Sequence, residues 1–419
     1  MSRLVMKFGG TSVADIERIR RVGALVAAEA ARRPTAVVVS AMAGRTNELV
    51  AWTDAVGAPT GEAVEGDDEY DAVVASGEQV TAGLLAMVLR HLGRPARSWM
   101  GWQIPILTDG AHGKARIEDI PASALAECLD RGEVAVIAGF QGVTRDGRIS
   151  TLGRGGSDTT AVAIAAALGP AACDIYTDVD GVYTTDPRIE SKARRLSRIS
   201  YEEMLEMASL GAKVLHTRSV EMAMAHGVPL RVLSSFVQPA SAEGANEGAG
   251  TIVCDEEEIV EKRIVSGVAF SRDEAKISLF GLPDHPGVSR EIFGRLADAN
   301  VNVDMIVQSH SRTAGAANME FTVGKRDAAR AVEIVRAAQA DIGFEDVAVD
   351  EDVAKVSVIG VGMRSHAGVA KTMFGALADK GVNIQVISTS EIKISVLIEA
   401  AYTELAVRAL HAAYGLDRL

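Results

Sequence analysis

The sequence contains Thr151-Leu-Gly-Arg-Gly-Gly-Ser-Asp-Thr-Thr160, a glycine-rich turn that leads directly into an apolar, alanine-rich run over residues 161–168. Its three closely spaced glycines leave backbone amides uncovered at the expected start of a helix, where an anion such as phosphate binds well. The same turn carries a cation, Arg154, and a carboxylate, Asp158. One loop could therefore hold a phosphate and both charged ends of an amino acid. A plain turn before a core helix is the alternative.

Short apolar runs and helical patterns alternate on both sides of this turn. Strands are predicted at residues 4–8, 36–40, 134–138 and 175–177, and helices at residues 14–32, 79–92 and 122–131. This alternation predicts a largely parallel sheet with helices on both faces. Ligands bind such sheets at the carboxyl ends of the strands. Three glycine-containing segments lie at such ends and favour the phosphate interpretation: Phe8-Gly-Gly10, Ser40-Ala-Met-Ala-Gly44 and Gly139-Phe-Gln-Gly142.

Length and composition limit the class of protein. At 419 residues the chain is long enough for two or three domains, and its 48% hydrophobic and 24% charged content is typical of a soluble globular protein. The net charge of −13 argues against nucleic acid as a partner. No apolar run reaches the ~20 residues of a membrane span, so no membrane partner is expected. The widely spaced Cys128, Cys173 and Cys254, and the lack of a signal-peptide pattern, favour the cytoplasm.

An internal repeat follows a change of composition. Residues 238–250 are rich in Ala, Gly, Ser and Glu, and we place a domain boundary near residues 255–265. Beyond it, Ala275-Lys-Ile-Ser-Leu-Phe-Gly281 matches Ala354-Lys-Val-Ser-Val-Ile-Gly360, and His285-Pro-Gly-Val288 matches His366-Ala-Gly-Val369. Each copy has the pattern strand, loop, helix, strand, strand, helix, which indicates duplication of one α+β module.

The expected domains are therefore residues 1–255, 264–350 and 351–419. The second copy leaves too few residues after its last helix for a firm closing strand. Residues 264–270 are strand-like and precede the first copy. We hypothesise that they complete the sheet of the second copy, which would tie the two modules together.

Two charged residues stand beside predicted element ends. Lys7 lies at the end of the first strand, where a lysine can reach a transferring phosphoryl group as a point charge. Ser76-Gly-Glu78 precedes a helix, and Glu78 could receive an ammonium group. The alternatives are a solvent-facing Lys7 and a Glu78 that only complements the helix dipole.

Further segments offer groups for a nucleotide. Thr177-Asp-Val-Asp-Gly-Val-Tyr183 follows a strand, and Thr184-Thr-Asp-Pro-Arg188 comes next. The Asp-x-Asp-Gly pattern is shared with calcium loops, but the later ligand positions and the final Glu of such loops are missing. A nucleotide loop fits better, because Tyr183 can lie against a base and Arg188 can reach phosphate.

A second lysine and a histidine occur in Gly211-Ala-Lys-Val-Leu-His216. Lys213 would be unremarkable alone, and we interpret His216 as structural. The P-loop signature Gly-x-x-x-x-Gly-Lys-Ser/Thr and the protein-kinase motifs are missing. A kinase with this sequence would belong to another class.

These motifs, in this order and spacing, resemble those of the aspartokinase family. The resemblance covers essentially the whole chain and includes Lys7-Phe-Gly-Gly-Thr-Ser12, Ser76-Gly-Glu78 and the three later segments. It implies the amino-acid-kinase fold, with a largely parallel sheet and helices on both faces, followed by two ACT modules of ferredoxin-like βαββαβ topology. It also implies that ATP and L-aspartate react to give ADP and 4-phospho-L-aspartate, the entry step to lysine, threonine and methionine.

The resemblance further implies which residues form the sites. The phosphate path is expected from Lys7, Gly9, Gly10 and Ser40. The aspartate site is expected from Thr46, Glu78, Arg154, Ser157 and Asp158. The nucleotide site is expected from Phe8, Gly155, Gly156, Thr177, Asp178, Tyr183, Thr184, Asp186, Pro187, Arg188 and Lys213. The candidate catalytic residues are Lys7, Asp158 and Lys213.

The chemistry of this reaction agrees with the residues present. A side-chain carboxylate with a pKa near ~3.9 is already ionised at neutral pH, so it needs no general base. The protein must instead hold two anions together and neutralise charge on the γ-phosphoryl oxygens. Lys7, Lys213, the loop amides and Mg²⁺ bound with the ATP would do this. No side chain is assigned as a metal ligand.

By the same resemblance, the repeats are expected to bind feedback amino acids, with lysine and threonine as the expected effectors. Such sites lie between modules, often from two chains, so a homo-oligomer is expected. The candidate effector residues are Asp284, His285, Pro286, Gly287, Asn302 and Gln308 in the first copy, and Ser365, Gly368, Asn383 and Ile384 in the second. The alternative is that the modules only hold a dimer together.

Two other functions stay open. One is another amino-acid kinase of the same fold, acting on glutamate or acetylglutamate, against which the tandem repeat and Ser76-Gly-Glu78 weigh. The other is a non-catalytic amino-acid sensor, against which the intact set of charged site residues weighs.

Overall fold

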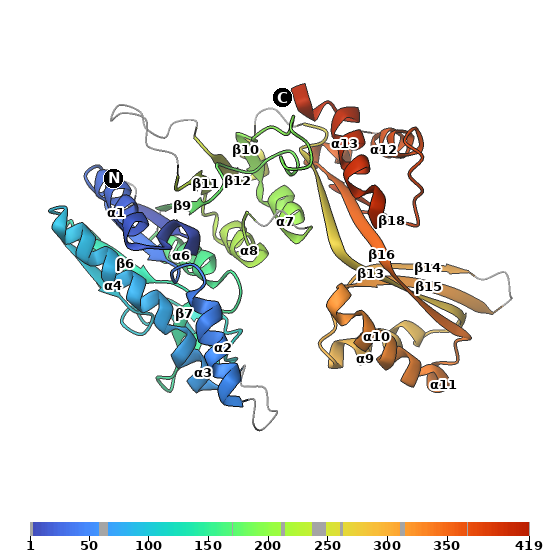
Figure 1. Ribbon diagram of the computed structural model, residues 1–419, viewed down its shortest axis with the longest axis horizontal. Coiled ribbons are helices and arrows are strands. Elements are labelled where there is room, and N and C mark those ends of the chain that lie inside the picture. The colour runs from blue at the N-terminus through green and yellow to red at the C-terminus, as the bar shows by residue number, and fades with distance from the viewer. Residues whose placement is uncertain are drawn as a thin grey trace. The chain divides into compact units, whose positions relative to one another are not determined.

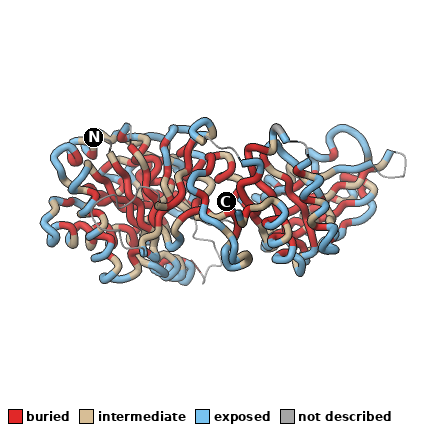
Figure 2. Tube along the Cα trace, turned by 90° about the horizontal axis from the view of Figure 1, so that it is seen from above, coloured by how far each residue is buried: buried red, intermediate tan, exposed pale blue. Residues whose placement is uncertain are grey.

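The computed structural model describes residues 3–57, 66–169, 171–210, 214–236, 249–259, 263–310, 315–366 and 368–418. The chain divides into two compact units (Figure 1). The first consists of Met1–Val182, Arg195–Ala208 and Lys213–Glu261, and the second of Tyr183–Arg194, Ser209–Ala212 and Lys262–Leu419. Each unit has its own buried interior (Figure 2).

The first unit is built on an eight-stranded sheet with the order β10-β12-β11-β9-β1-β2-β6-β3. Its strands are β1 (Arg3–Phe8), β2 (Thr35–Val39), β3 (Ala96–Trp99), β6 (Val134–Ala138), β9 (Ala171–Thr177), β10 (Arg198–Ser200), β11 (Leu230–Ser234) and β12 (Thr251–Cys254). All neighbours pair in parallel except β11 and β12. Every residue of β2 and β6 is buried, as expected for apolar strands covered on both faces.

Helices cover both faces of this sheet, because successive side chains of a strand point to opposite sides. Leu4, Met6 and Phe8 of β1 pack in one core with α1 (Ile16–Ala30) and α4 (Ser76–His91). The alternate residues face α6 (Gly156–Ala167), which is apolar almost all round and mostly buried. The remaining helices of this unit are α2 (Arg45–Gly57), α3 (Asp68–Val74), α5 (Ser123–Asp130), α7 (Tyr201–Ser209), α8 (Thr217–His226), and the short η1 (Gly10–Val13) and η2 (Glu256–Glu258).

A small four-stranded sheet carries the chain into the glycine-rich turn. Its order is β5-β4-β7-β8, with β4 (Leu107–Thr108), β5 (Ile117–Asp119), β7 (Gln141–Val143) and β8 (Ile149–Thr151). Strand β8 ends at the first residue of the turn, and α6 begins within it. The turn therefore connects the small sheet to α6, and α6 leads on to β9 of the large sheet.

One helical stretch meets the length and composition of a membrane span. Residues Asp68–His91 do so, and half of their most apolar window is buried inside the protein. The structure forms this stretch as α3 and α4, and Leu85 and Leu89 of α4 belong to the core under β1. Its apolar character is thus accounted for by packing on the sheet.

The second unit contains one six-stranded antiparallel sheet with the order β14-β15-β13-β16-β18-β17. Its strands are β13 (Gly267–Pro283), β14 (Val303–His310), β15 (Ala316–Val323), β16 (Asp346–Ile359), β17 (Val386–Thr389) and β18 (Lys393–Glu399). Its helices are α9 (Val288–Asp298), α10 (Lys325–Ala337), α11 (Gln339–Ile342), α12 (Val369–Ala378), α13 (Thr403–Ala413), η3 (Val361–Ser365), η4 (Ala400–Tyr402) and η5 (Leu416–Arg418).

The two long central strands are shared by the repeats. The second half of β13 pairs with β15 of the first copy, while Gly267 to Ser271 pair with Ile359 to Lys355 of the second copy. Conversely, Asp346 to Asp350, at the start of β16, pair with Phe280 to Lys276 of the first copy. Val265 and Val268 belong to the core of the second copy.

Residues 183–194, which the predicted first domain includes, belong to the second unit. The carbonyl of Thr184 accepts a hydrogen bond from the amide of Val268 at 2.8 Å. Arg408 of α13 donates to the carbonyl of Ile189 at 2.9 Å. The boundaries predicted for the three domains otherwise stay a prediction.

Because the repeats share these strands, a small cavity at the start of β13 should destabilise the second repeat. Val268 is 2% exposed, so Val268→Ala should cost about 2 kcal/mol of unfolding free energy. Native-state hydrogen exchange should then speed up in β16 and β18, because these strands share its core. Val349→Ala, at a site 43% exposed, is the matched control and should change little. Faster exchange confined to β15 would contradict the assignment.

Candidate active site

Left-handed glycines give the glycine-rich turn its shape. Gly153 and Gly155 have φ of 73° and 75°, a region that favours glycine. A Cβ atom at Gly155 would also lie 2.3 Å from Cγ of His216, and one at Gly156 would lie 2.8 Å from Cδ2 of Phe140. The turn thus needs glycine both for its backbone angles and for close packing. Gly155 caps α6 without a side-chain hydrogen bond to the first helical amides.

An ion pair joins the end of β1 to the start of α6. Nζ of Lys7 lies 2.6 Å from Oδ1 of Asp158, and the two side chains are only 11% and 14% exposed. The neighbouring Phe8 points to the other face of the sheet, where it stacks on Tyr176 at 4.6 Å between ring centroids. Phe8 therefore supports β1 by packing, and Lys7 presents the charge.

Arg154 is the exposed cation of the turn. Within the described ranges it has no ion pair, so its guanidinium is available to fork onto a carboxylate. Ser157 lies in the first turn of α6 and is 7% exposed. It packs closely on Gly139, which directly follows β6. Thr46 is half-buried in the first turn of α2.

Two bare glycines follow Lys7. A Cβ atom at Gly9 would lie 3.4 Å from Nζ of Lys7, and one at Gly10 would lie 2.9 Å from the carbonyl oxygen of Ala41. The amide of Ser40 donates to the carbonyl of Phe8 at 3.1 Å. The ends of β1 and β2 are therefore drawn together beside Lys7 without intervening side chains.

Glu78 is a buried carboxyl group at the start of α4. It is 3% exposed, and its Oε1 accepts a hydrogen bond from the amide of Ala41 at 2.9 Å. Its Oε2 is buried and has no hydrogen-bond partner among the described residues. Burial raises the pKa of Glu78 to about 7. Such a group gains an ion pair if a ligand brings an ammonium to it.

The end of β9 carries the first predicted nucleotide residues. Oγ1 of Thr177 donates to Asp178 at 3.1 Å, and the carbonyl of Thr177 accepts from the amide of Ser235 at 3.0 Å. β9 pairs in parallel with β1, and Tyr176 lies opposite Phe8. Thr177 is the next residue after Tyr176. These residues lie at the same sheet edge as Lys7.

The other predicted nucleotide residues lie in the second unit or outside the described part of the chain. Thr184 is fully buried, and its hydroxyl lies 2.9 Å from Nε2 of His411, so its side chain has no surface for a nucleotide. Asp186 accepts hydrogen bonds from Arg188, which lowers the pKa of Asp186. Tyr183 is half-buried, Pro187 is exposed, and Lys213 lies outside the described residues.

Sequence reasoning missed residues that support the turn from behind. Asp71 of α3 is fully buried and bonds to Thr151, Gly113 and His112. Arg218 of α8 donates to the carbonyl of Leu152. Asp71 stands in an acidic run that has the composition of a solvated helix start, so nothing local in the sequence separates it from its exposed neighbours.

The first repeat contains a cavity of about 330 Å³ in the loop before α9. Five predicted effector residues line it, namely Asp284, His285, Pro286, Gly287 and Gln308. Asn302 is exposed and is not among the lining residues. The volume is at the lower end of the range for small-molecule sites.

The second repeat preserves the corresponding helix start. Gly287 and Gly368 precede α9 and α12 with φ of 108° and 107°. Asn383 is exposed and Ile384 is half-buried, whereas the side chain of Ser365 lies outside the described part.

In the part of the chain that the structure describes, no group of three or more His, Cys, Asp or Glu side chains could hold a metal ion.

Comparisons with known proteins agree with this architecture. The amino acid kinase family model matches residues 2–234, and the ACT domain model matches residues 277–339 and 356–414. The aspartate kinase of Pseudomonas fluorescens is 53% identical over 421 residues, covering 100% of this chain and 98% of that protein. The predicted amino-acid-kinase fold with ACT modules is therefore confirmed.

Two solved structures match over nearly the whole chain. E. coli aspartokinase III in complex with aspartate and ADP (R-state) gives a TM-score of 0.79 at 29% identity and covers 99% of each chain. The same protein in complex with lysine and aspartate (T-state) gives 0.75 at 29% identity, covering 98% of this chain and 99% of that one. By full-length identity, family models and fold, the chain belongs to the aspartokinase family.

Proposed function

We propose that the protein transfers the γ-phosphoryl group of ATP to the side-chain carboxylate of L-aspartate, giving ADP and 4-phospho-L-aspartate. The buried Lys7–Asp158 pair beside the glycine-rich turn carries this proposal. It places a fixed cation beside the uncovered backbone of Gly9 and Gly10, where we propose that phosphate binds. A solved relative, E. coli aspartokinase III, binds aspartate and ADP.

The site residues divide the work of binding two anions. Arg154 forks onto the α-carboxylate of aspartate, and Glu78 receives its ammonium group. Lys7 and the turn amides receive the phosphate oxygens, and Asp158 holds the Lys7 ammonium in place. Mg²⁺ bound with ATP would add positive charge at the phosphates, and Lys213 is proposed as a second cation. The aspartate carboxylate is ionised at neutral pH, so it attacks without a general base.

The role of Lys7 predicts a selective loss of turnover. Lys7→Ala should lower kcat by about 10²–10³-fold, because a preorganised charge at the transferring group is removed. An aspartate-hydroxamate assay measures this, with circular dichroism to verify folding. Arg3→Ala is the matched control, since Arg3 lies on the same strand but pairs with Asp130 at the opposite end. Turnover by Lys7→Ala close to that of wild type would exclude the role.

The raised pKa of Glu78 predicts that aspartate binding releases a proton. The free carboxyl group is mostly protonated below its pKa of about 7, and an ammonium beside it favours the ionised form. The number of protons released per bound aspartate should therefore be roughly 0.9 at pH 6, roughly 0.5 at pH 7 and near zero at pH 9. Calorimetry in buffers of different ionisation enthalpy measures it. Glu78→Gln should abolish this pH-dependent release, and unchanged release in that variant would assign the proton elsewhere.

We further propose that the ACT modules regulate this activity in response to lysine and threonine. The cavity before α9 has the size and polar lining of an amino-acid site, and E. coli aspartokinase III binds lysine. Within this proposal the protein acts in the cytoplasm as a homo-oligomer. It catalyses the first step toward lysine, threonine and methionine.

Feedback predicts inhibition that depends on the lining of this cavity. Lysine, threonine or both should lower the aspartate kinase rate, and Asp284→Asn should weaken that inhibition without changing the uninhibited rate. Steady-state assays with each amino acid and with the pair measure this. Equal rates under all conditions would leave the modules with a role in assembly only.

A further inference from the structure

The carboxylate of Asp71 is a buried anchor for the start of the glycine-rich turn. The residue is fully buried, and it accepts the amides of Thr151 at 2.9 Å and Gly113 at 3.1 Å. It also accepts the hydroxyl of Thr151 and lies 2.8 Å from Nδ1 of His112. Nδ1 of His112 donates to this carboxylate in the tautomer that carries its proton there. Four donors from two loops thus converge on one side chain.

Arg218 holds the same two loops from α8. Its guanidinium donates to the carbonyl of Leu152 and to the carbonyl of Ala115, each at 2.8 Å. Burial lowers the pKa of Arg218, and its guanidinium makes both of these hydrogen bonds to backbone carbonyls. A cation held by two backbone carbonyls has its geometry set by the loops that it joins.

The two loops also bind each other directly. The amide of Ala115 donates to the carbonyl of Thr151 at 2.9 Å, and a Cβ atom at Gly153 would lie 3.0 Å from the carbonyl oxygen of Gly113. Thr151 and Leu152 stand immediately before Gly153 and Arg154 in the turn. The loop around residue 113 is therefore the support on which the first half of the turn rests.

We propose that Asp71 and Arg218 are positioning residues of the kinase. They fix Thr151 and Leu152, and through them they hold Arg154 and Asp158 where aspartate binds. This inference rests on the proposed function. A turn with two left-handed glycines has little stiffness of its own, and a displacement of about 1 Å in a substrate-positioning group is enough to cost ~10²-fold in rate.

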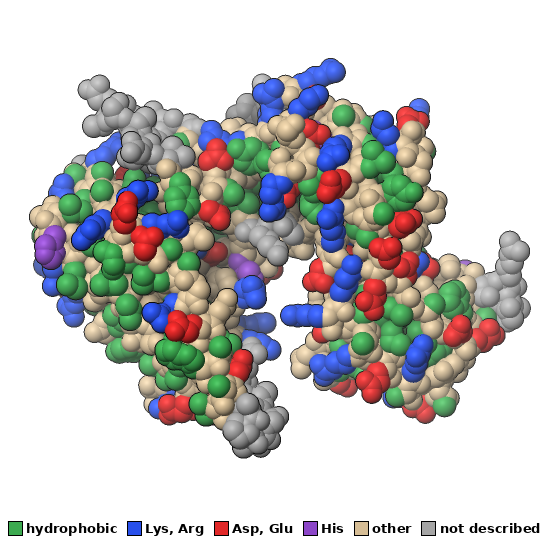
Figure 3. Space-filling view, in the orientation of Figure 1, with side chains coloured by type: hydrophobic (Ala, Val, Ile, Leu, Met, Phe, Trp, Pro, Cys, Tyr) green, Lys and Arg blue, Asp and Glu red, His purple; other side chains and the backbone are tan. Residues whose placement is uncertain are grey.

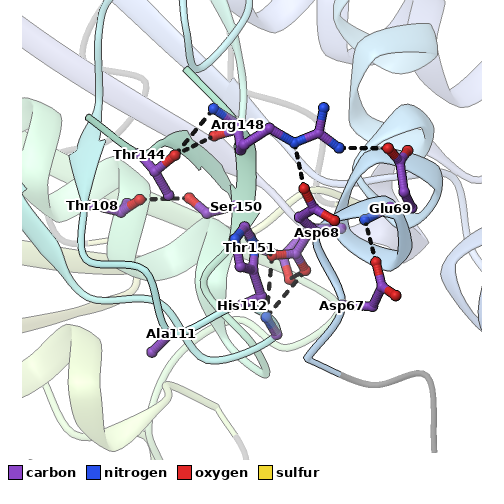
Figure 4. Close-up of polar contacts among 12 residues, drawn as sticks. Asp67, Asp68, Glu69, Thr108, Ala111, His112, Thr144, Arg148, Ser150 and Thr151 are labelled. Atoms are coloured by element: carbon purple, nitrogen blue, oxygen red, sulfur yellow. Dashed lines mark hydrogen bonds and ion pairs between the residues drawn. The ribbon is translucent and has the colours of Figure 1, made fainter. Parts of the chain in front are cut away.

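The exposed edge of the same cluster provides matched controls. Arg148 pairs with Asp68 at 2.5 Å and with Glu69 at 2.6 Å, and these side chains are 40–75% exposed (Figure 4). Asp68 and Asp71 lie one helical turn apart in α3, so they share a local sequence and a secondary structure. Only Asp71 reaches the turn. Exposed ion pairs contribute little to stability, so changing Asp68 tests the helix without touching the anchor.

Kinetics of three variants test the proposal. Asp71→Asn keeps the shape of the side chain but turns an NH₂ group toward the donors, and Arg218→Lys cannot reach both carbonyls. Each should raise KM for aspartate about tenfold or more and change KM for ATP far less. Asp68→Asn should stay within about twofold of wild type. Equal rises in both KM values, or none, would overturn the proposal.

Hydrogen exchange gives a readout that does not depend on catalysis. In Asp71→Asn and Arg218→Lys, amides of residues 151–157 should exchange faster, while those of β6 and β9 keep wild-type rates. An equal increase across the sheet would show general destabilisation and would overturn the positioning role. If wild type does not phosphorylate aspartate, the proposed function fails, but the exchange result still decides whether these residues hold the turn.

A milder variant covers the case in which Asp71→Asn does not fold. Thr151→Val removes only the hydroxyl bond to Asp71 and leaves the amide bond in place. It should raise KM for aspartate in the same direction by a smaller factor. Wild-type kinetics together with wild-type exchange over residues 151–157 in this variant would count against the anchor.

Discussion

The contact between Lys7 and Asp158 links the end of the first strand to the first turn of α6. A charged pair that is nearly closed to water persists only if its surroundings hold both groups in place. β1 does this for Lys7, because it is paired with a neighbouring strand on both sides from Leu4 to Phe8. For Asp158 the support is the glycine-rich turn, whose own position depends on the loops behind it. The positions of Lys7 and Asp158 relative to each other therefore depend on the contacts that hold the turn between the small sheet and the large sheet.

This arrangement solves an electrostatic problem of the whole chain. With a net charge of −13, the protein repels anions at long range, and both ligands of the proposed reaction are anions. Acidic and basic side chains are interspersed over the visible surface (Figure 3). Attraction must therefore come from a few donors that lie close to the bound anions. In the proposed reaction, Lys7, Arg154 and the bare amides of the turn would supply it, and the buried Glu78 would offer a counter-charge for the amino group.

Much of the fold could be predicted from local pattern. Strand β6 coincides with the predicted residues 134–138, because five consecutive apolar residues buried on both faces give an unambiguous signal. β9 begins at Ala171, four residues earlier than the predicted 175–177. The charged Asp174 interrupts the apolar pattern, but the strand can bury it because Arg231 pairs with it at 2.5 Å. That partner is 57 residues away in sequence, so no local pattern could reveal it.

The same reason limits what could be predicted of the site. The glycine-rich turn, Lys7 and Glu78 have short, recognisable contexts, and the structure brings them to one edge of the sheet. Asp71 looks like any acid of a solvated helix start until the fold closes over it. Thr184 has the opposite fate: it follows a nucleotide-type motif, but it is buried against His411 in the second unit. Burial by distant segments, rather than residue type, decides both cases.

The strands β13 and β16 have a consequence for how this gene can change. Each repeat borrows a stretch of backbone that is encoded next to the other, so neither copy is a self-sufficient cassette. Excising one would leave the survivor with an open row of unpaired amides and carbonyls, which is a template for aggregation. Loss of either copy therefore removes backbone partners from the other, whereas side chains can change in one copy without breaking the shared strands.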